Sequence, residues 1–213
     1  MRRLSGVLLG GLLLTVTAGS AFAQAEAWQR KWYWGAQTGA YIYSTASSAT
    51  RTAVTAGGHW FITARRSALI MSVDQIFFGT TNAALTDGST VRFNSGRRIQ
   101  GSLVAVPSNA NLQPYVGVGF AIHNITDATA TGSFATPDDQ AAAQRRLSDV
   151  DTKAFVVFTG GFQWRMGTRW AFYGNYQYMP SSGSFLITSE QHAITAGLRV
   201  ALSSSHEEVT TER

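Results

Sequence analysis

The chain has 213 residues, of which 12% are aromatic, 21 are glycine, four are proline and none is cysteine. Its length suits a single domain, the absence of cysteine excludes a small scaffold held by disulfides, and a net charge of +5 is too weak to indicate a nucleic-acid-binding protein. A sequence rich in glycine, threonine and aromatic residues with few prolines favours β-strands over helices.

The first 23 residues have the features of a cleaved secretory signal. Two arginines precede an apolar stretch at 4–18, and residues 21–23 read Ala-Phe-Ala. The stretch is shorter than the roughly 20 residues that a membrane-spanning helix needs, so an uncleaved anchor is the less favoured alternative. Residue Gln24 is not the cysteine of a lipoprotein. We therefore expect an exported protein that is cleaved after Ala23.

Eight segments after the signal alternate between apolar and polar residues. No later stretch approaches 18 uninterrupted apolar residues, so no helical membrane span is expected. Strands can cross a bilayer only in a closed barrel, because every backbone amide must be paired inside the protein. An even number of strands is typical of bacterial barrels. The predicted strands are 32–45, 52–63, 68–80, 90–106, 113–124, 153–164, 170–179 and 192–202.

The connections between these strands alternate in length. Short turns on one side and longer loops on the other are typical of outer-membrane barrels, whose turns lie in the periplasm. The short connections are 64–67, 107–112 and 165–169, and the mostly longer ones are 46–51, 81–89, 125–152 and 180–191.

The last strand shows most clearly which face would contact lipid. Ile194, Leu198 and Leu202 fall on one face, and Arg199 falls on the other. An arginine facing lipid would cost about 2–4 kcal/mol at mid-membrane, so we expect Arg199 to face the lumen. A soluble sandwich with these apolar faces inside is disfavoured, because the opposite faces are too small and polar to form its exterior. The predicted fold class is all-β, an eight-stranded antiparallel up-and-down transmembrane β-barrel over residues 24–202.

The fourth strand departs from this pattern. Arg97 shares the apolar face of Val91, Phe93 and Ile99. We expect either that the strand projects above the bilayer or that a bulge at Gly96 shifts its register. Both interpretations leave Arg97 in water.

The interior of an eight-stranded barrel is narrow enough to be filled by side chains. Buried charges persist only when they are paired, so we expect Asp74 to meet one or more of Arg92, Arg98 and Arg199. A network that plugs the lumen is favoured over a narrow ion path. The residues expected to face the lumen are Gln37, His59, Asp74, Arg92, Arg98, Gln163, Asn175 and Arg199.

Two segments, 114–120 and 195–202, resemble the central and last strands of the small outer-membrane β-barrel family of the OmpA and OmpX type. In that family the last strand is recognised by the barrel assembly machinery, and Thr195, Gly197, Val200 and Leu202 match its pattern. The resemblance implies an outer-membrane location, extracellular long loops, and contact with membrane lipid and lipopolysaccharide. The polar tail at 203–213 is expected in the periplasm and is too short for a peptidoglycan-binding domain.

The longest loop, 125–152, is expected to contain a short helix. Pro137 and two aspartates would begin it, and Arg145 and Arg146 would end it, which suits the helix dipole. These arginines are candidates for contact with a partner or with lipopolysaccharide phosphates, although a solvated surface helix is the favoured alternative. The spacing of Asp138, Asp139, Asp149 and Asp151 in this loop is not that of a calcium-binding EF-hand, so no metal is expected.

Three function classes remain open. The favoured one is a non-enzymatic barrel that supports the envelope or presents its loops for interaction. A narrow channel for small or apolar solutes is the second, and a membrane-embedded lipid A hydrolase or acyltransferase is the third. Such an enzyme needs a histidine placed with serine and a carboxylate, and neither His123 nor His192 lies in the His-x-Ser-Asn run of lipid A deacylases. We therefore predict no catalytic residue and no cofactor.

Overall fold

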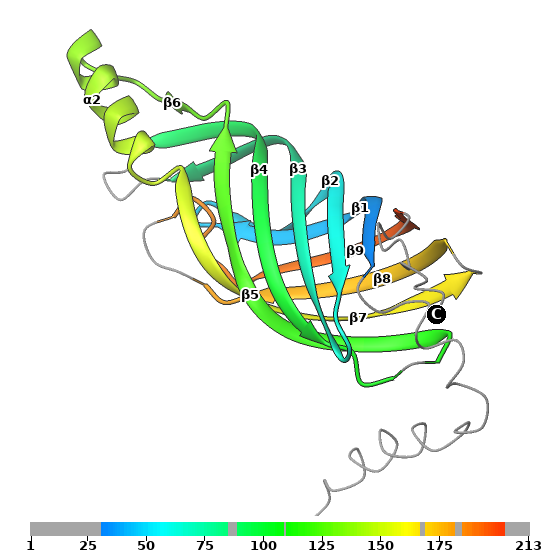
Figure 1. Ribbon diagram of the computed structural model, residues 1–213. Helices are drawn as coiled ribbons and strands as arrows, with labels where there is room; N and C mark the ends of the chain where they lie inside the picture. The colour runs from blue at the N-terminus through cyan, green and yellow to red at the C-terminus, as the bar shows by residue number, and fades with distance from the viewer. Residues whose placement is uncertain (1–30, 85–88, 109, 167–168, 182–184, 203–213) are drawn as a thin grey trace, which may run out of the picture.

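The computed structural model describes residues 31–84, 89–108, 110–166, 169–181 and 185–202. The predicted signal at 1–23 and the polar tail at 203–213 lie outside these residues. In the part that is described, eight long antiparallel strands close into a barrel, and a short strand and a helix extend from one end (Figure 1).

The strands confirm the predicted fold class. Each long strand pairs antiparallel with the next, and β1 and β9 close the barrel in a register that places Tyr33 opposite Ala201. The turn between β1 and β2 has only two residues, so the longer connection expected at 46–51 was wrong. The bounds are β1 (Trp32–Thr45), β2 (Ser48–Thr63), β3 (Ser67–Ala84), β4 (Thr90–Ala105), β5 (Leu112–Thr126), β7 (Thr152–Met166), β8 (Trp170–Met179) and β9 (Gln191–Ala201).

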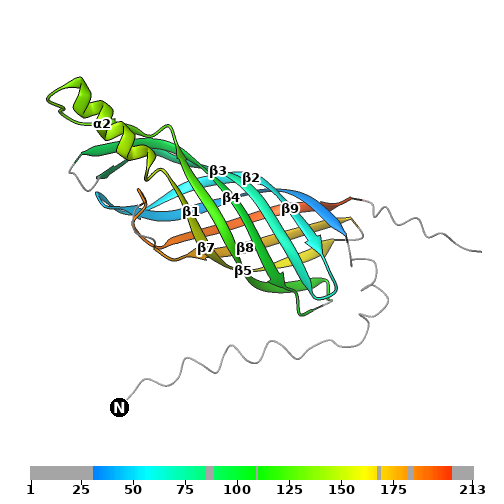
Figure 2. The same ribbon diagram turned by 60° about the vertical axis from the view of Figure 1, so that its left-hand side comes forward.

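The connection between β5 and β7 forms β6 (Thr129–Thr131) and α2 (Pro137–Ser148), which project beyond the barrel (Figures 1 and 2). Strand β6 extends the sheet by pairing with the start of β4. Thr136 caps the helix by accepting from the Asp139 amide, and the Asp139 carboxylate accepts from the Thr136 amide in return. The predicted helix is thus present. Across the described ranges, no helix is long and apolar enough to cross a membrane.

The two ends of the barrel differ. We call the end where β2 joins β3, β4 joins β5 and β7 joins β8 the short-turn end, and the opposite end the long-loop end. Helix α2 and strand β6 lie at the long-loop end, and β1 begins at the short-turn end (Figure 1).

The outer surface of the barrel is apolar along every long strand. On β5, Val116 is 64% exposed and Phe120 is 67% exposed. All eight long strands carry exposed large apolar side chains, because the alternation of each strand sends one face outward. The result is an apolar belt around the barrel.

The interior is layered. An apolar cluster near the short-turn end contains Tyr33, Phe61 and Tyr115. A larger cluster near the long-loop end is built around Tyr41, Tyr43, Phe78 and Phe155, and it is completed by residues 185–187 of the β8–β9 connection. In that connection Ile187 forms a bridge with Thr45 and is fully buried. The layer between the two clusters is polar.

The alternation of β4 changes phase between Ser95 and Gly96, the place where the sequence suggested a bulge. Val91 and Phe93 are buried before this point, and Arg98 is buried after it. On the neighbouring β3, residues 78–80 bulge between Phe77 and Thr81, with Gly79 at a φ of 63°. Arg97 is therefore exposed on the outer surface, opposite Gln75 and Asn124.

Candidate functional site

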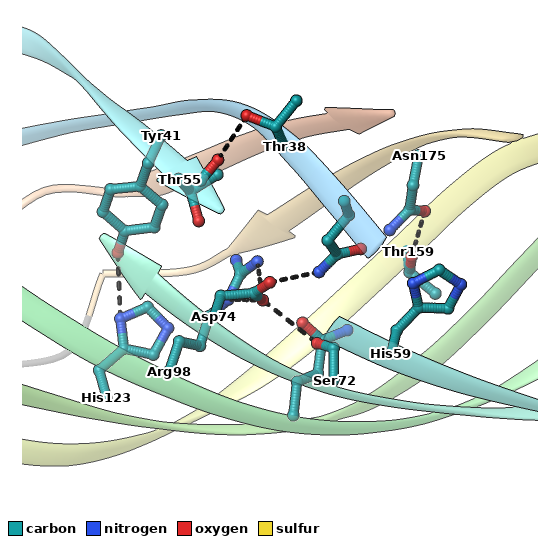
Figure 3. A network of polar contacts seen from close by, with 12 residues as sticks. Thr38, Tyr41, Thr55, His59, Ser72, Asp74, Arg98, His123, Thr159 and Asn175 are labelled. Carbon is teal, nitrogen blue, oxygen red and sulfur yellow. Dashed lines mark hydrogen bonds and ion pairs between the residues drawn. The ribbon is translucent and has the colours of Figure 1, made fainter. Parts of the chain in front are cut away.

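The polar layer of the lumen is organised around a buried salt bridge. Asp74 of β3 and Arg98 of β4 are directly paired in the sheet, and Arg98 Nη2 lies 2.8 Å from Asp74 Oδ2. Arg98 Nε donates to the same oxygen at 3.2 Å, Ser72 Oγ donates to it at 3.2 Å, and the Gln37 side-chain amide donates to Asp74 Oδ1 (Figure 3). A carboxylate in this position needs such partners, because burial removes its hydration.

Hydrogen bonds lead from Asp74 across the lumen to Arg199. The Tyr173 hydroxyl donates to Gln37 Oε1 at 2.6 Å and lies 2.9 Å from His59 Nδ1. The other ring nitrogen, His59 Nε2, accepts from Arg199 Nε at 2.8 Å. These contacts join β3, β1, β8, β2 and β9.

The direction of each bond in this series follows from the chemistry of its ends. A guanidinium can only donate, so His59 Nε2 accepts, and the neutral ring carries its proton on Nδ1. That proton points to the Tyr173 oxygen, the Tyr173 hydroxyl donates to Gln37, and Gln37 donates to Asp74. Every bond between Arg199 and Asp74 therefore runs from the cation toward the anion.

Arg199 also connects to the remaining side of the barrel. Its Nη1 donates to Gln163 Oε1 at 2.8 Å, and Gln163 Nε2 donates to Gln113 Oε1. The guanidinium carbon lies 4.0 Å from the ring centre of Phe61 and 3.9 Å from that of Tyr173. Ring faces at this distance stabilise a cation that has been taken out of water.

We call this connected series the lumen chain. Each of the eight long strands contributes one member, so the chain links strands that are not neighbours in the sheet. All of its members are buried. In order along the chain they are Arg98 (β4), Asp74 (β3), Gln37 (β1), Tyr173 (β8), His59 (β2), Arg199 (β9), Gln163 (β7) and Gln113 (β5).

The placement expected for Arg92 was wrong. The structure brings Asp74, Arg98 and Arg199 into the lumen, but Arg92 is exposed on the outer surface of β4, between the inward-facing Val91 and Phe93. Unbroken alternation would put residues 92 and 98 on one face. The phase change at Ser95–Gly96 separates them.

Two members of the lumen chain were not singled out from the sequence. Tyr173 shares the inward face of β8 with Asn175, which was expected in the lumen, and Gln113 begins the predicted strand 113–124. Their inward positions were thus foreseeable from alternation, but their bonds were not. Near the chain, Thr159 donates to the Asn175 side chain at 2.8 Å (Figure 3).

The other predicted residues lie away from the lumen chain or at its edge. Arg145 and Arg146 are exposed in the last turn of α2, outside the barrel. Of the four residues expected to guide assembly, Thr195 faces inward, Gly197 lies against the Tyr173 ring, Val200 is half-buried and Leu202 is exposed.

All three histidines in the described residues contact tyrosine hydroxyls. His59 contacts Tyr173, His123 Nδ1 lies 3.1 Å from the Tyr41 hydroxyl (Figure 3), and His192 Nδ1 lies 2.7 Å from the Tyr176 hydroxyl. Within the described ranges, no group of three or more histidines and carboxylates is placed to hold a metal ion.

Comparison with known proteins shows similarity in fold. No protein family and no curated protein matches the sequence. The crystal structure of Neisserial surface protein A is similar with a TM-score of 0.54 at 11% identity, over 79% of this chain and 96% of that one. The N-terminal β-barrel domain of Pseudomonas aeruginosa OprF gives a TM-score of 0.48 at 10% identity, over 82% and 98%. The eight closed strands and the similarity to Neisserial surface protein A show that the chain has the fold of a small eight-stranded outer-membrane β-barrel.

Proposed function

We propose that this protein is a non-enzymatic outer-membrane β-barrel that supports the cell envelope, with a lumen filled by its own side chains. The distribution of polarity carries the proposal. Charged and amide side chains are buried inside, whereas large apolar side chains cover the outside of every long strand. A barrel dissolved in water would have the reverse arrangement, and a lipid bilayer stabilises this one.

The layers of the interior support a filled lumen. The lumen chain crosses the middle of the barrel, and apolar clusters lie above and below it. Eight strands enclose a space that side chains of this size can fill. A channel for small or apolar solutes would need a path through all three layers.

The proposal extends to partners. Strand β9 and the residue that follows it offer Thr195, Gly197, Val200 and Leu202 to the barrel assembly machinery, and the outer belt contacts membrane lipid. Helix α2 projects from the long-loop end with Arg145 and Arg146 exposed, where they can meet lipopolysaccharide phosphates. In this orientation the signal is removed after Ala23 and the long loops are extracellular.

No catalytic step is part of the proposal. Hydrolases that act through histidine orient the ring with a carboxylate and place a nucleophile beside it. His123 and His192 instead contact tyrosine hydroxyls.

The proposal is tested by refolding residues 24–213 into lipid vesicles and comparing unheated and boiled samples on a denaturing gel, with circular dichroism of the same samples. We expect a β-rich spectrum and a mobility that changes on boiling. A water-soluble monomer that needs no amphiphile would contradict the proposal.

Two arginine substitutions on the outer face of β5 locate the membrane belt. Val118→Arg places a charge at the middle of the belt and should lower the stability of the inserted barrel by about 2–4 kcal/mol. Asn124→Arg is the matched control, because it lies on the same face near the long-loop end and should change stability little. Equal effects would argue against a membrane belt.

A further inference from the structure

The tryptophans mark one end of the barrel. All five tryptophans in the described residues lie on the outer face near the short-turn end, and the rings of Trp34 and Trp60 contact each other with centres 4.5 Å apart. Tryptophan is enriched where a membrane meets water. The five are Trp32, Trp34, Trp60, Trp164 and Trp170.

The charges at this end have one sign. Arg65 and Arg66 are exposed in the β2–β3 turn, Arg169 is exposed between β7 and β8, and Lys31 is half-buried before β1. The described residues of the connections at this end include no aspartate or glutamate. The long-loop end, in contrast, carries both signs. A basic rim beside a tryptophan band is suited to anionic lipid head groups.

A hollow on the outer surface lies next to this rim. It has a volume of about 610 Å³ and is lined by Leu112, Phe162, Trp164, Met166 and Phe172. Trp164 lies in its middle, paired with Leu112 on one side and Phe172 on the other. Phe162 and Met166 are four residues apart on β7, which is about 13 Å along a strand. This length accommodates a substantial part of an acyl chain.

Arg169 lies beyond the Met166 end of the hollow. Met166 ends β7 and is paired with Trp170, so Arg169 lies just beyond the last rung of the sheet. An acyl chain in the hollow would therefore bring its head group to the level of this guanidinium. Arginine binds phosphate by charge-assisted hydrogen bonds.

We propose that the hollow and Arg169 form a binding site for one anionic phospholipid, with an acyl chain against Trp164 and the phosphate at Arg169. The inference rests on the proposed function, since it requires a membrane around the belt. It commits to a phospholipid rather than lipopolysaccharide, because in the proposed orientation the short-turn end faces the periplasmic leaflet.

The test uses native mass spectrometry of residues 24–213, refolded in non-ionic micelles that contain equal amounts of phosphatidylglycerol and phosphatidylcholine with the same acyl chains. We expect one phosphatidylglycerol to be retained in preference to phosphatidylcholine. Arg169→Gln should reduce this preference about fivefold, the effect of one arginine near an anionic surface.

Two further variants separate the head-group and acyl-chain contacts. Arg65→Gln is the matched control, because the β2–β3 turn is opposite the β7–β8 connection in the strand order. It should leave the preference unchanged. Leu112→Phe narrows the hollow without changing its polarity and should reduce retention of both lipids. All variants are first checked for the mobility change on boiling.

The inference is overturned if the folded barrel retains both lipids equally, if Arg65→Gln and Arg169→Gln have the same effect, or if purified lipid A displaces phosphatidylglycerol more readily than added phosphatidylglycerol does. These outcomes leave the proposed function intact. A chain that stays soluble and monomeric without any amphiphile would instead overturn the proposed function, and this inference with it.

Discussion

At the scale of single residues, the buried charges in the described part of the chain are one carboxylate, Asp74, and three guanidinium groups, Arg98, Arg165 and Arg199. Asp74 faces Arg98, while Arg199 is held by the neutral His59 and Gln163 and by two aromatic rings. This arrangement works only if His59 offers a lone pair to Arg199. Tyr173 secures that tautomer by accepting the proton on the other side of the ring.

Tyr173→Phe tests the continuity of the lumen chain. The change removes one oxygen and leaves the His59 Nδ1 proton and Gln37 Oε1 buried without this partner. We expect the free energy of unfolding to fall by about 1–3 kcal/mol, the cost of unmade buried hydrogen bonds. Urea unfolding from vesicles, followed by tryptophan fluorescence, measures it.

Tyr178→Phe is the matched control for this change. Tyr178 lies on the outer face of the same strand, β8. It should shift the unfolding midpoint little. If both substitutions lower the free energy of unfolding equally, the Tyr173 hydroxyl does not stabilise the barrel more than the outward-facing Tyr178 hydroxyl does.

At the scale of elements, the seam between β1 and β9 closes the sheet, and Gly197 lies on it. A Cβ at Gly197 would lie 2.1 Å from the Ala36 carbonyl oxygen and 2.9 Å from Tyr173 Cε1. The backbone of β1 and the ring of Tyr173 thus both occupy the space of a side chain. Glycine at this position is required for close approach, besides its place in the expected assembly pattern.

Gly197→Ala should therefore impair closure of the barrel. We expect a lower yield of the heat-modifiable form after refolding into vesicles, because β1 or β9 must move to relieve the contact. Gly101→Ala is the matched control, since a Cβ at this glycine of β4 meets no atom within 4 Å. Equal yields for both variants would show that the contact at the seam relaxes without cost.

Alternation made most strands predictable from the sequence, because one residue type on each face leaves little choice of register. It failed at Arg92, because the phase change between Ser95 and Gly96 reverses which residues of β4 face the lumen. Apolar residues occur along β4 both before and after this point. Residues 185–187 lie in the expected connection 180–191. Their burial inside the barrel was not predicted, because an apolar run of three residues has no periodicity. The partners within the lumen chain were not predictable, since a bond such as Arg199 to His59 joins residues 140 positions apart.

At the scale of the whole molecule, the interior of the barrel contains two apolar clusters with the polar lumen chain between them. Residues 185–187 contribute to the cluster at the long-loop end. We predict that the protein reconstituted in a planar lipid bilayer passes no resolvable single-channel current. A general porin in the same apparatus is the positive control, and current steps of porin size would contradict a filled lumen.

The lumen chain also has a consequence for how many strands this sequence can use. Each long strand provides one member of the lumen chain, and these side chains reach one another only across the diameter that eight strands enclose. A duplicated hairpin would widen the barrel and separate Arg199 from His59 and Gln163. A deleted hairpin would remove two members of the lumen chain. The lumen chain thus restricts the barrel to eight strands. This sequence could form a larger barrel only if its inward-facing residues were substituted together.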